Sequence, residues 1–201
     1  SDTSFSGNKN GALQIARSNV TTLTGLTFTG NLGGHTLSIE QSAAFSASDL
    51  VFQDNESTAI AFKEAYGEVN GVSITDQNAE YYAGLHVRWG SVVSVDDIDI
   101  SPVSGSDAWL IHIAGASGAG LFDESSLSLS NATLSGGGIW IKGDAVLNNV
   151  TIDGTAGDGI HMNEDDATLT ATDLTVTNAG GSCIYLSSVS TAITLENTLI
   201  D

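Results

Sequence analysis

The sequence predicts an all-β fold, a parallel β-helix solenoid of about eight coils with three short strands in each coil. Three observations support this prediction. An alternation of apolar and polar residues, which is typical of strands, recurs along the whole chain. The repeats follow one another at a step of about 25 residues, within the range of solenoid repeats. A Gly, Asn or Asp residue also stands at the same place in every repeat.

The first part of each coil consists of two alternating apolar segments separated by two residues. The clearest copies are Val93–Ile100, Leu127–Leu134, Ala145–Ile152, Leu169–Val176 and Ile193–Ile200, and looser copies end at Phe28, Phe52 and Ile74. The residue just before the second segment is Asp2, Gly25, Asp49, Gly71, Asp97, Asn131, Asn149, Asp173 or Asn197. Because Gly, Asn and Asp tolerate a left-handed backbone, we expect a bend between the two strands of each coil.

A third strand is predicted later in each coil by a short pair of apolar residues. The pairs are Leu13/Ile15, Leu37/Ile39, Ile60/Phe62, Leu85/Val87, Ile111/Ile113, Ile139/Ile141, Ile160/Met162 and Ile184/Leu186. Since side chains alternate between the two faces of a strand, these pairs are expected to point into the solenoid. The residues between and after them are expected to point outward.

The composition limits the partners of the chain. Its 24 Asp and Glu residues against 5 Lys and Arg residues give a formal net charge of −19. Such a charge argues against nucleic acid, whose binding proteins need a basic surface, and against an anionic membrane surface. No apolar run approaches the roughly 20 residues of a membrane span, so no membrane insertion by this segment is expected. Cys183 is the only cysteine, which excludes an internal disulfide.

The strand–turn–strand coils resemble the right-handed parallel β-helix of the pectate-lyase superfamily, over essentially all of residues 1–201. Near the N-terminus, Phe5–Asn8, Phe28–Asn31 and Phe52–Asn55 are similar to the FxxN motif of polymorphic outer-membrane-protein repeats, and Asn10–Leu13 is similar to their GGA motif. The first resemblance implies a right-handed solenoid. The second implies an extracellular or cell-surface protein, such as an autotransporter passenger, with a structural or adhesive role.

We expect one β-helix domain over residues 1–201. The chain shows no polar cap, and both ends stop at the same phase of the coil. Because an open coil exposes unpaired strand edges, we expect either a segment of a longer protein or a protomer that stacks end to end into a filament.

The outward residues of the third strand gather most of the chemistry. The first outward column reads Gln14, Ser38, Ala61, His86, His112, Trp140, His161, Tyr185, and the second reads Ala16, Glu40, Lys63, Arg88, Ala114, Lys142, Asn163, Ser187. Trp89 and Trp109 stand close to the edges of this face. Rings cover the apolar faces of sugars, and Lys or Arg binds carboxylates or sulfates.

We therefore predict a face that binds glycans or a cell-surface polysaccharide. Its predicted ligand-binding residues are His86, Arg88, His112, Trp140, Lys142, His161, Tyr185 and Lys63. An equally weighted alternative is that the rings stack for stability alone, since such side chains pack well between neighbouring strands.

Catalysis is the less favoured hypothesis. A glycoside hydrolase uses two carboxylates about 5–10 Å apart, and Glu40 is the one carboxylate at a strand position of this face. The residue set of polygalacturonases is absent. If the chain is an enzyme, a uronate lyase or epimerase is expected, with Tyr185 or His161 as the base and Lys142 or Arg88 neutralising the substrate carboxylate.

No cofactor is predicted. Acidic residues near Asn163, Asp165 and Asp166 raise the hypothesis of calcium binding, because calcium prefers clusters of oxygen ligands. The spacing is not that of an EF-hand, and carboxylates solvated in a turn are the preferred interpretation.

Overall fold

The structure is a computed structural model that describes residues 3–78, 82–103, 109–115, 124–188 and 191–201. Regular structure in these residues is all β, in agreement with the predicted fold class. No helix long and apolar enough to cross a membrane occurs among them. The strands are β1 (Thr3–Ser6), β2 (Leu13–Ala16), β3 (Thr21–Thr29), β4 (His35–Glu40), β5 (Phe45–Gln53), β6 (Thr58–Lys63), β7 (Tyr66–Gln77), β8 (Tyr82–Arg88), β9 (Val92–Val103), β10 (Trp109–Ile113), β11 (Ser126–Ser135), β12 (Ile139–Ile141), β13 (Asp144–Asp153), β14 (Ile160–Met162), β15 (Thr168–Thr177), β16 (Ile184–Leu186), β17 (Ala192–Glu196) and β18 (Leu199–Ile200).

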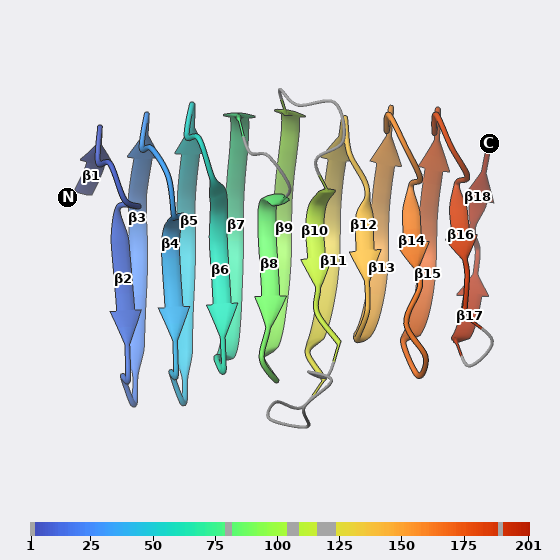
Figure 1. The fold of residues 1–201 in the computed structure, drawn as a ribbon, viewed down its shortest axis with the longest axis horizontal. Helices are drawn as coiled ribbons and strands as arrows, with labels where there is room; N and C mark the ends of the chain where they lie inside the picture. Colours follow the sequence, from blue (N-terminus) through green and yellow to red (C-terminus); the bar gives the residue numbers. More distant parts are fainter. Residues whose placement is uncertain (1–2, 79–81, 104–108, 116–123, 189–190) are drawn as a thin grey trace.

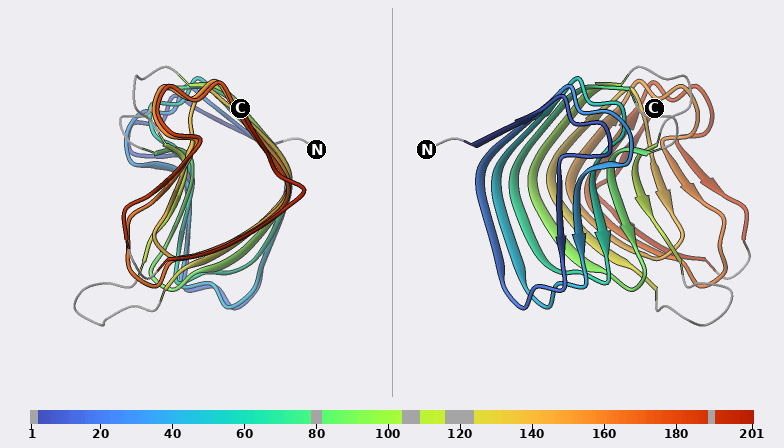
Figure 2. Two further views of the ribbon diagram at one scale, coloured as in Figure 1. Left: turned by 90° about the vertical axis from the view of Figure 1, so that its right-hand side faces the viewer. Right: turned by 60° about the vertical axis from the view of Figure 1, so that its left-hand side comes forward.

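The strands form two parallel sheets that wind around one axis (Figure 1). Sheet A follows the order β1-β3-β5-β7-β9-β11-β13-β15-β17, with β18 also paired to β15. Sheet B follows the order β2-β4-β6-β8-β10-β12-β14-β16, one strand from each of eight coils in the described part of the chain. Viewed along the axis, the coils lie over one another (Figure 2, left). Apolar side chains from both sheets form one buried core between them. The predicted parallel solenoid is confirmed.

The predicted bend lies inside the long strands of sheet A. The backbone angle φ is positive at Gly25, Asp49, Gly71, Asp97, Asn131, Asn149, Asp173 and Asn197, while Asp2 lies outside the described residues. In most coils the two segments flanking the bend therefore form one bent strand rather than two separate strands. The side chains also bond along this column, because the Asn149 amide Nδ2 donates to Asn131 Oδ1 at 2.8 Å.

A second left-handed column, which the sequence did not predict, follows the first four strands of sheet B, β2, β4, β6 and β8. Positive φ angles occur at Arg17, Gln41, Glu64 and Trp89. Three of these side chains are joined across coils: Arg17 Nε donates to Gln41 Oε1 at 3.2 Å, and Gln41 Nε2 donates to Glu64 Oε2 at 3.1 Å. Long polar side chains thus occupy a turn whose backbone would favour Gly or Asn.

The FxxN segments have a structural role inside the N-terminal coils. The rings of Phe5, Phe28 and Phe52 stack with centroids 5.1 and 4.7 Å apart. Asn31 and Asn55 are fully buried, and Asn31 Nδ2 donates to Asn55 Oδ1 at 2.9 Å. Each amide thereby satisfies buried polar groups of the neighbouring coil, which would be costly to leave without partners.

Candidate functional site

The outer face of sheet B brings the predicted rings together in register. His86 pairs with His112, which pairs with Trp140, and the column continues through His161 to Tyr185. Successive ring centroids are 4.9, 4.9, 6.1 and 4.8 Å apart. The five rings form a continuous ring ladder along β8, β10, β12, β14 and β16, as the alternation of the sequence indicates.

Tyr82 and Trp109 add a second layer of rings. Tyr82 stacks on His112, with centroids 4.4 Å apart and planes inclined by 9°, and also lies 4.7 Å from His86. Trp109 lies 5.9 Å from Trp140. These two residues begin β8 and β10 and are paired with each other across the strands.

The sequence placed Trp109 close to the edge of this face, but it did not predict the contribution of Tyr82 or the second layer of rings. Strict alternation from Ile111 would point Trp109 inward and Leu110 outward. The register shifts between Trp109 and Ile111, and Leu110 is fully buried instead. A register irregularity of one residue moves a side chain to the opposite face of the sheet.

The two layers divide the rings into a floor and a platform. His86 and His112, which we call the floor, are only 7% and 6% exposed beneath Tyr82. The other rings, Tyr82, Trp109, Trp140, His161 and Tyr185, are half-buried or exposed, and we call them the aromatic platform. Ligand binding by His86 and His112 stays a prediction, but the structure places them where they support the platform.

Burial keeps the floor imidazoles uncharged at neutral pH. It lowers the pKa of His86 to about 2, and it lowers the pKa of His112 to about 4, with smaller contributions from nearby positive charges. His35 lies next to this floor, 6.0 Å from His86, and burial together with Arg88 and Lys63 lowers its pKa to about 4. All three therefore act as neutral rings.

Hydrogen bonds fix the orientation of two platform rings. Trp140 Nε1 donates to Asn163 Oδ1 at 2.9 Å. The His161 Nδ1 atom lies 2.8 Å from Asp158 Oδ2, and the other carboxylate oxygen of Asp158 accepts the backbone N–H of Ser182 at 2.8 Å. The platform is therefore held in place by its own surroundings.

The predicted cations all lie on this face, but the two lysines are paired. Lys142 Nζ donates to Glu164 Oε1 at 2.8 Å and lies 4.4 Å from the ring centroid of Trp140. Lys63 forms an ion pair with Glu40.

Arg88 differs from the lysines. Its guanidinium carbon lies 4.6 Å from the ring centroid of Trp89, and its Nη2 atom lies 3.3 Å from His35 Nε2. Arg88 and His161 are on β8 and β14, three coils apart, which is about 14 Å along the axis at the usual strand spacing. The structure thus does not bring Arg88 next to His161.

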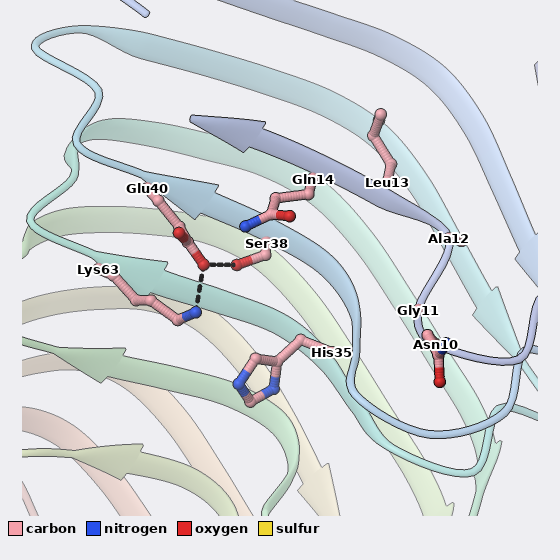
Figure 3. Close-up of a pocket in the computed structure, with 9 residues that line it drawn as sticks. All are labelled: Asn10, Gly11, Ala12, Leu13, Gln14, His35, Ser38, Glu40 and Lys63. Carbon is pink, nitrogen blue, oxygen red and sulfur yellow. Dashed lines mark hydrogen bonds and ion pairs between the residues drawn. The ribbon is translucent and has the colours of Figure 1, made fainter. Parts of the chain in front are cut away.

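A hollow of about 310 Å³ lies at the N-terminal end of the same face (Figure 3). Gln14, Ser38, Glu40, Lys63 and His35 are among its lining residues. Ser38 Oγ donates to Glu40 Oε1 at 2.9 Å. Burial alone would raise the pKa of the Glu40 carboxyl, but hydrogen bonds from Lys63 and Ser38 outweigh this effect and lower the pKa.

A family model described as the right-handed β-helix region matches residues 10–200. The chain belongs to the right-handed β-helix family. This membership confirms the predicted β-helix repeat fold, whereas the closer similarity to outer-membrane-protein repeats stays a prediction. A search of curated proteins found no match for this β-helix.

The calcium candidates of this β-helix have protein partners or lie in a turn. Asn163 Oδ1 accepts the indole N–H of Trp140, and Asp165 accepts the hydroxyl of Ser188. Asp166 is an exposed residue with a φ of 70°. Across the described ranges, no group of three or more His, Cys, Asp or Glu side chains is placed to hold a metal ion.

Proposed function

We propose that this β-helix is a structural or adhesive module of a surface protein that binds carbohydrate on its aromatic platform. The observation that carries the proposal is the placement of one half-buried or exposed ring on each of β8, β10, β12, β14 and β16. A pyranose presents apolar C–H faces that pack on aromatic rings. Because the rings follow one another from coil to coil, an extended saccharide chain is able to lie along the solenoid axis.

The rigidity of the platform supports binding. Tyr82 rests on His112, the indole of Trp140 is held by Asn163, and His161 is held by Asp158. Side chains that are already ordered lose little conformational entropy when a ligand binds. The buried floor is then explained as the support of the platform.

A polysaccharide-active enzyme of the uronate lyase or epimerase type is the second candidate. The 2.8 Å contact between His161 Nδ1 and Asp158 leaves Nε2 of the same ring available for proton transfer, with Tyr185 stacked 4.8 Å away. However, such an enzyme must neutralise the carboxylate of its substrate, and Lys142 is already paired with Glu164. Binding without turnover therefore has the stronger support.

A glycan array followed by calorimetric titration tests the first candidate. We expect Trp140→Ala to weaken binding of the recognised oligosaccharide about tenfold, because a stacking ring is lost. Tyr66→Ala is the matched control, since Tyr66 is 48% exposed at the start of a sheet A strand. Equal losses in both variants, or no recognised glycan at all, would contradict the proposal.

The second candidate has its own assay. Polygalacturonate and polymannuronate are incubated with the protein. The absorbance of unsaturated uronates reports a lyase, and NMR of the polymer reports an epimerase, whose product contains no new double bond. Product formation that disappears in His161→Ala would favour the enzyme over the binding module.

A further inference from the structure

We infer that the aromatic platform selects uncharged saccharide chains and discriminates against chains that carry uronate or sulfate groups. This inference rests on the proposed carbohydrate binding and names the class of ligand. It differs from the expectation, drawn from the sequence, that Lys and Arg on this face bind acidic groups. The structure gives three reasons, which concern the platform itself, the rest of the face and the whole chain.

The platform carries no unpaired cation within the described residues. Lys142 contacts the ring of Trp140 from above, but its ammonium group is already bound to the Glu164 carboxylate at 2.8 Å. Asp158 adds a second carboxylate beside His161. A uronate that approaches Lys142 must therefore displace Glu164 or accept its repulsion.

Of the other two cations on the face, Lys63 is neutralised by a carboxylate and Arg88 lies against neighbouring rings. Lys63 is paired with Glu40, and the Glu40 charge also acts on Arg88. The guanidinium of Arg88 lies against the ring of Trp89 and beside His35 Nε2, on a strand two coils from Trp140 and three coils from His161. The buried imidazoles of His86 and His112 add no positive charge at neutral pH, because burial holds their pKa values at about 2 and about 4.

The chain as a whole repels anions. Its formal charge is −19, and the turn after β14 carries Glu164, Asp165 and Asp166 next to the platform. At physiological ionic strength this field extends over about 8 Å, the Debye length. An acidic saccharide would meet repulsion without the local cation that could compensate for it.

Uncharged hydroxyl groups suit the same surroundings. A hydroxyl both donates and accepts hydrogen bonds. The Lys142–Glu164 pair presents a donor beside an acceptor, and neighbouring hydroxyls of one sugar could bind to both without breaking the ion pair. The face can therefore form hydrogen bonds with the hydroxyl groups of neutral sugars, whereas its carboxylates repel acidic sugars.

The experiment uses a printed panel of hexasaccharides at 20 mM and 500 mM salt. The neutral members are gluco-, galacto-, manno- and xylohexaose, and the acidic members are galacturonate and mannuronate hexamers. We expect binding of one or more neutral members, with affinity changing less than about twofold with salt, since no counterion is released. Acidic members should bind at least about tenfold more weakly at low salt.

The outcomes separate the inference from the proposed function. Tighter binding of an acidic hexamer would overturn the inference and leave carbohydrate binding intact. Binding of no hexasaccharide at either salt concentration would overturn both.

A pair of charge variants locates the selectivity. Glu164→Gln frees Lys142, and we expect it to improve binding of the acidic hexamers about two- to fivefold, the effect of an exposed ion pair. Glu68→Gln removes the same charge from an exposed position on sheet A and serves as the matched control. Equal improvement in both variants would contradict the role of the Lys142–Glu164 pair.

Discussion

Tyr82 lies flat on His112, with ring centroids 4.4 Å apart and ring planes inclined by 9°. This contact separates the ring ladder of sheet B into a buried floor and an accessible platform. It joins residues that are 30 positions apart in the sequence but belong to neighbouring strands β8 and β10. The contact therefore explains how a uniform row of outward side chains acquires two different environments.

The first prediction concerns this contact. Tyr82→Ala should uncover His112 and raise its pKa from about 4 by at least one unit, because burial is the main cause of the depressed value. Titration of the His112 ring resonances by NMR measures the shift. Tyr82→Phe keeps the stacked ring and should leave the pKa of His112 unchanged, and an equally low value in Tyr82→Ala would contradict the burial explanation.

The second prediction concerns the dependence of stability on pH. The pKa of His86 is about 2 in the folded state and about 6.5 in the unfolded state, so the unfolded state binds more protons between these values. The free energy of unfolding should therefore fall as pH decreases below 6.5, by up to about 1.4 kcal/mol per pH unit for each buried imidazole. Urea denaturation between pH 7 and pH 4.5 measures the slope.

His86→Phe is the comparison for that experiment. It keeps a ring in the floor and removes one titrating group, so its stability should depend less steeply on pH. A slope identical to that of the unmodified protein would show that His86 is not the source of the effect.

The third prediction concerns the buried amides. Asn31 accepts hydrogen bonds from Asn8 and donates to Phe5 O and to Asn55. Asn31→Leu should lower the free energy of unfolding by about 2–4 kcal/mol, since buried polar groups lose their partners. Asn19→Leu changes an exposed Asn in the same way and should stay within about 0.5 kcal/mol. Similar losses in the two variants would contradict a structural role of the FxxN asparagine.

The fourth prediction concerns the bend. Asn149 has a φ of 54°, which costs Ala about 1 kcal/mol relative to Gly. Asn149→Ala and Asn149→Gly both lose the hydrogen bond to Asn131, so their difference isolates the backbone contribution. In thermal or urea unfolding, Asn149→Gly should be more stable than Asn149→Ala. The reverse order would show that residue 149 is not selected for its ability to adopt a left-handed backbone.

Much of the fold could be predicted from local patterns. Period-two alternation identifies the inward pairs of sheet B, such as Leu85/Val87, and Asn or Asp marks a left-handed bend, as at Asn149. The second left-handed column could not be predicted in this way. Glu64 and Trp89 adopt positive φ angles because the stacked coils impose the turn, not because of their own preferences.

The site could be predicted only in part. Alternation places His161 and Tyr185 on one face, but it says nothing of the Asp158 carboxylate that reaches His161 from the preceding turn. The register shift before Ile111 moves Trp109 to the outer face, which strict alternation contradicts. Pairing of Lys142 with Glu164 likewise depends on the path of a turn between coils, which the residue pattern does not determine.

Indole resonances give the most direct test of carbohydrate binding on the platform. The chain has three tryptophans, of which Trp109 and Trp140 belong to the platform and Trp89 lies beyond the end of β8. The ¹⁵N-labelled protein is titrated with each neutral hexasaccharide of the panel while its indole N–H signals are recorded. We predict saturable shifts of the Trp109 and Trp140 signals with little change at Trp89. Shifts confined to Trp89 or to the backbone amides of sheet A, or no shift with any of the four sugars, would contradict the account.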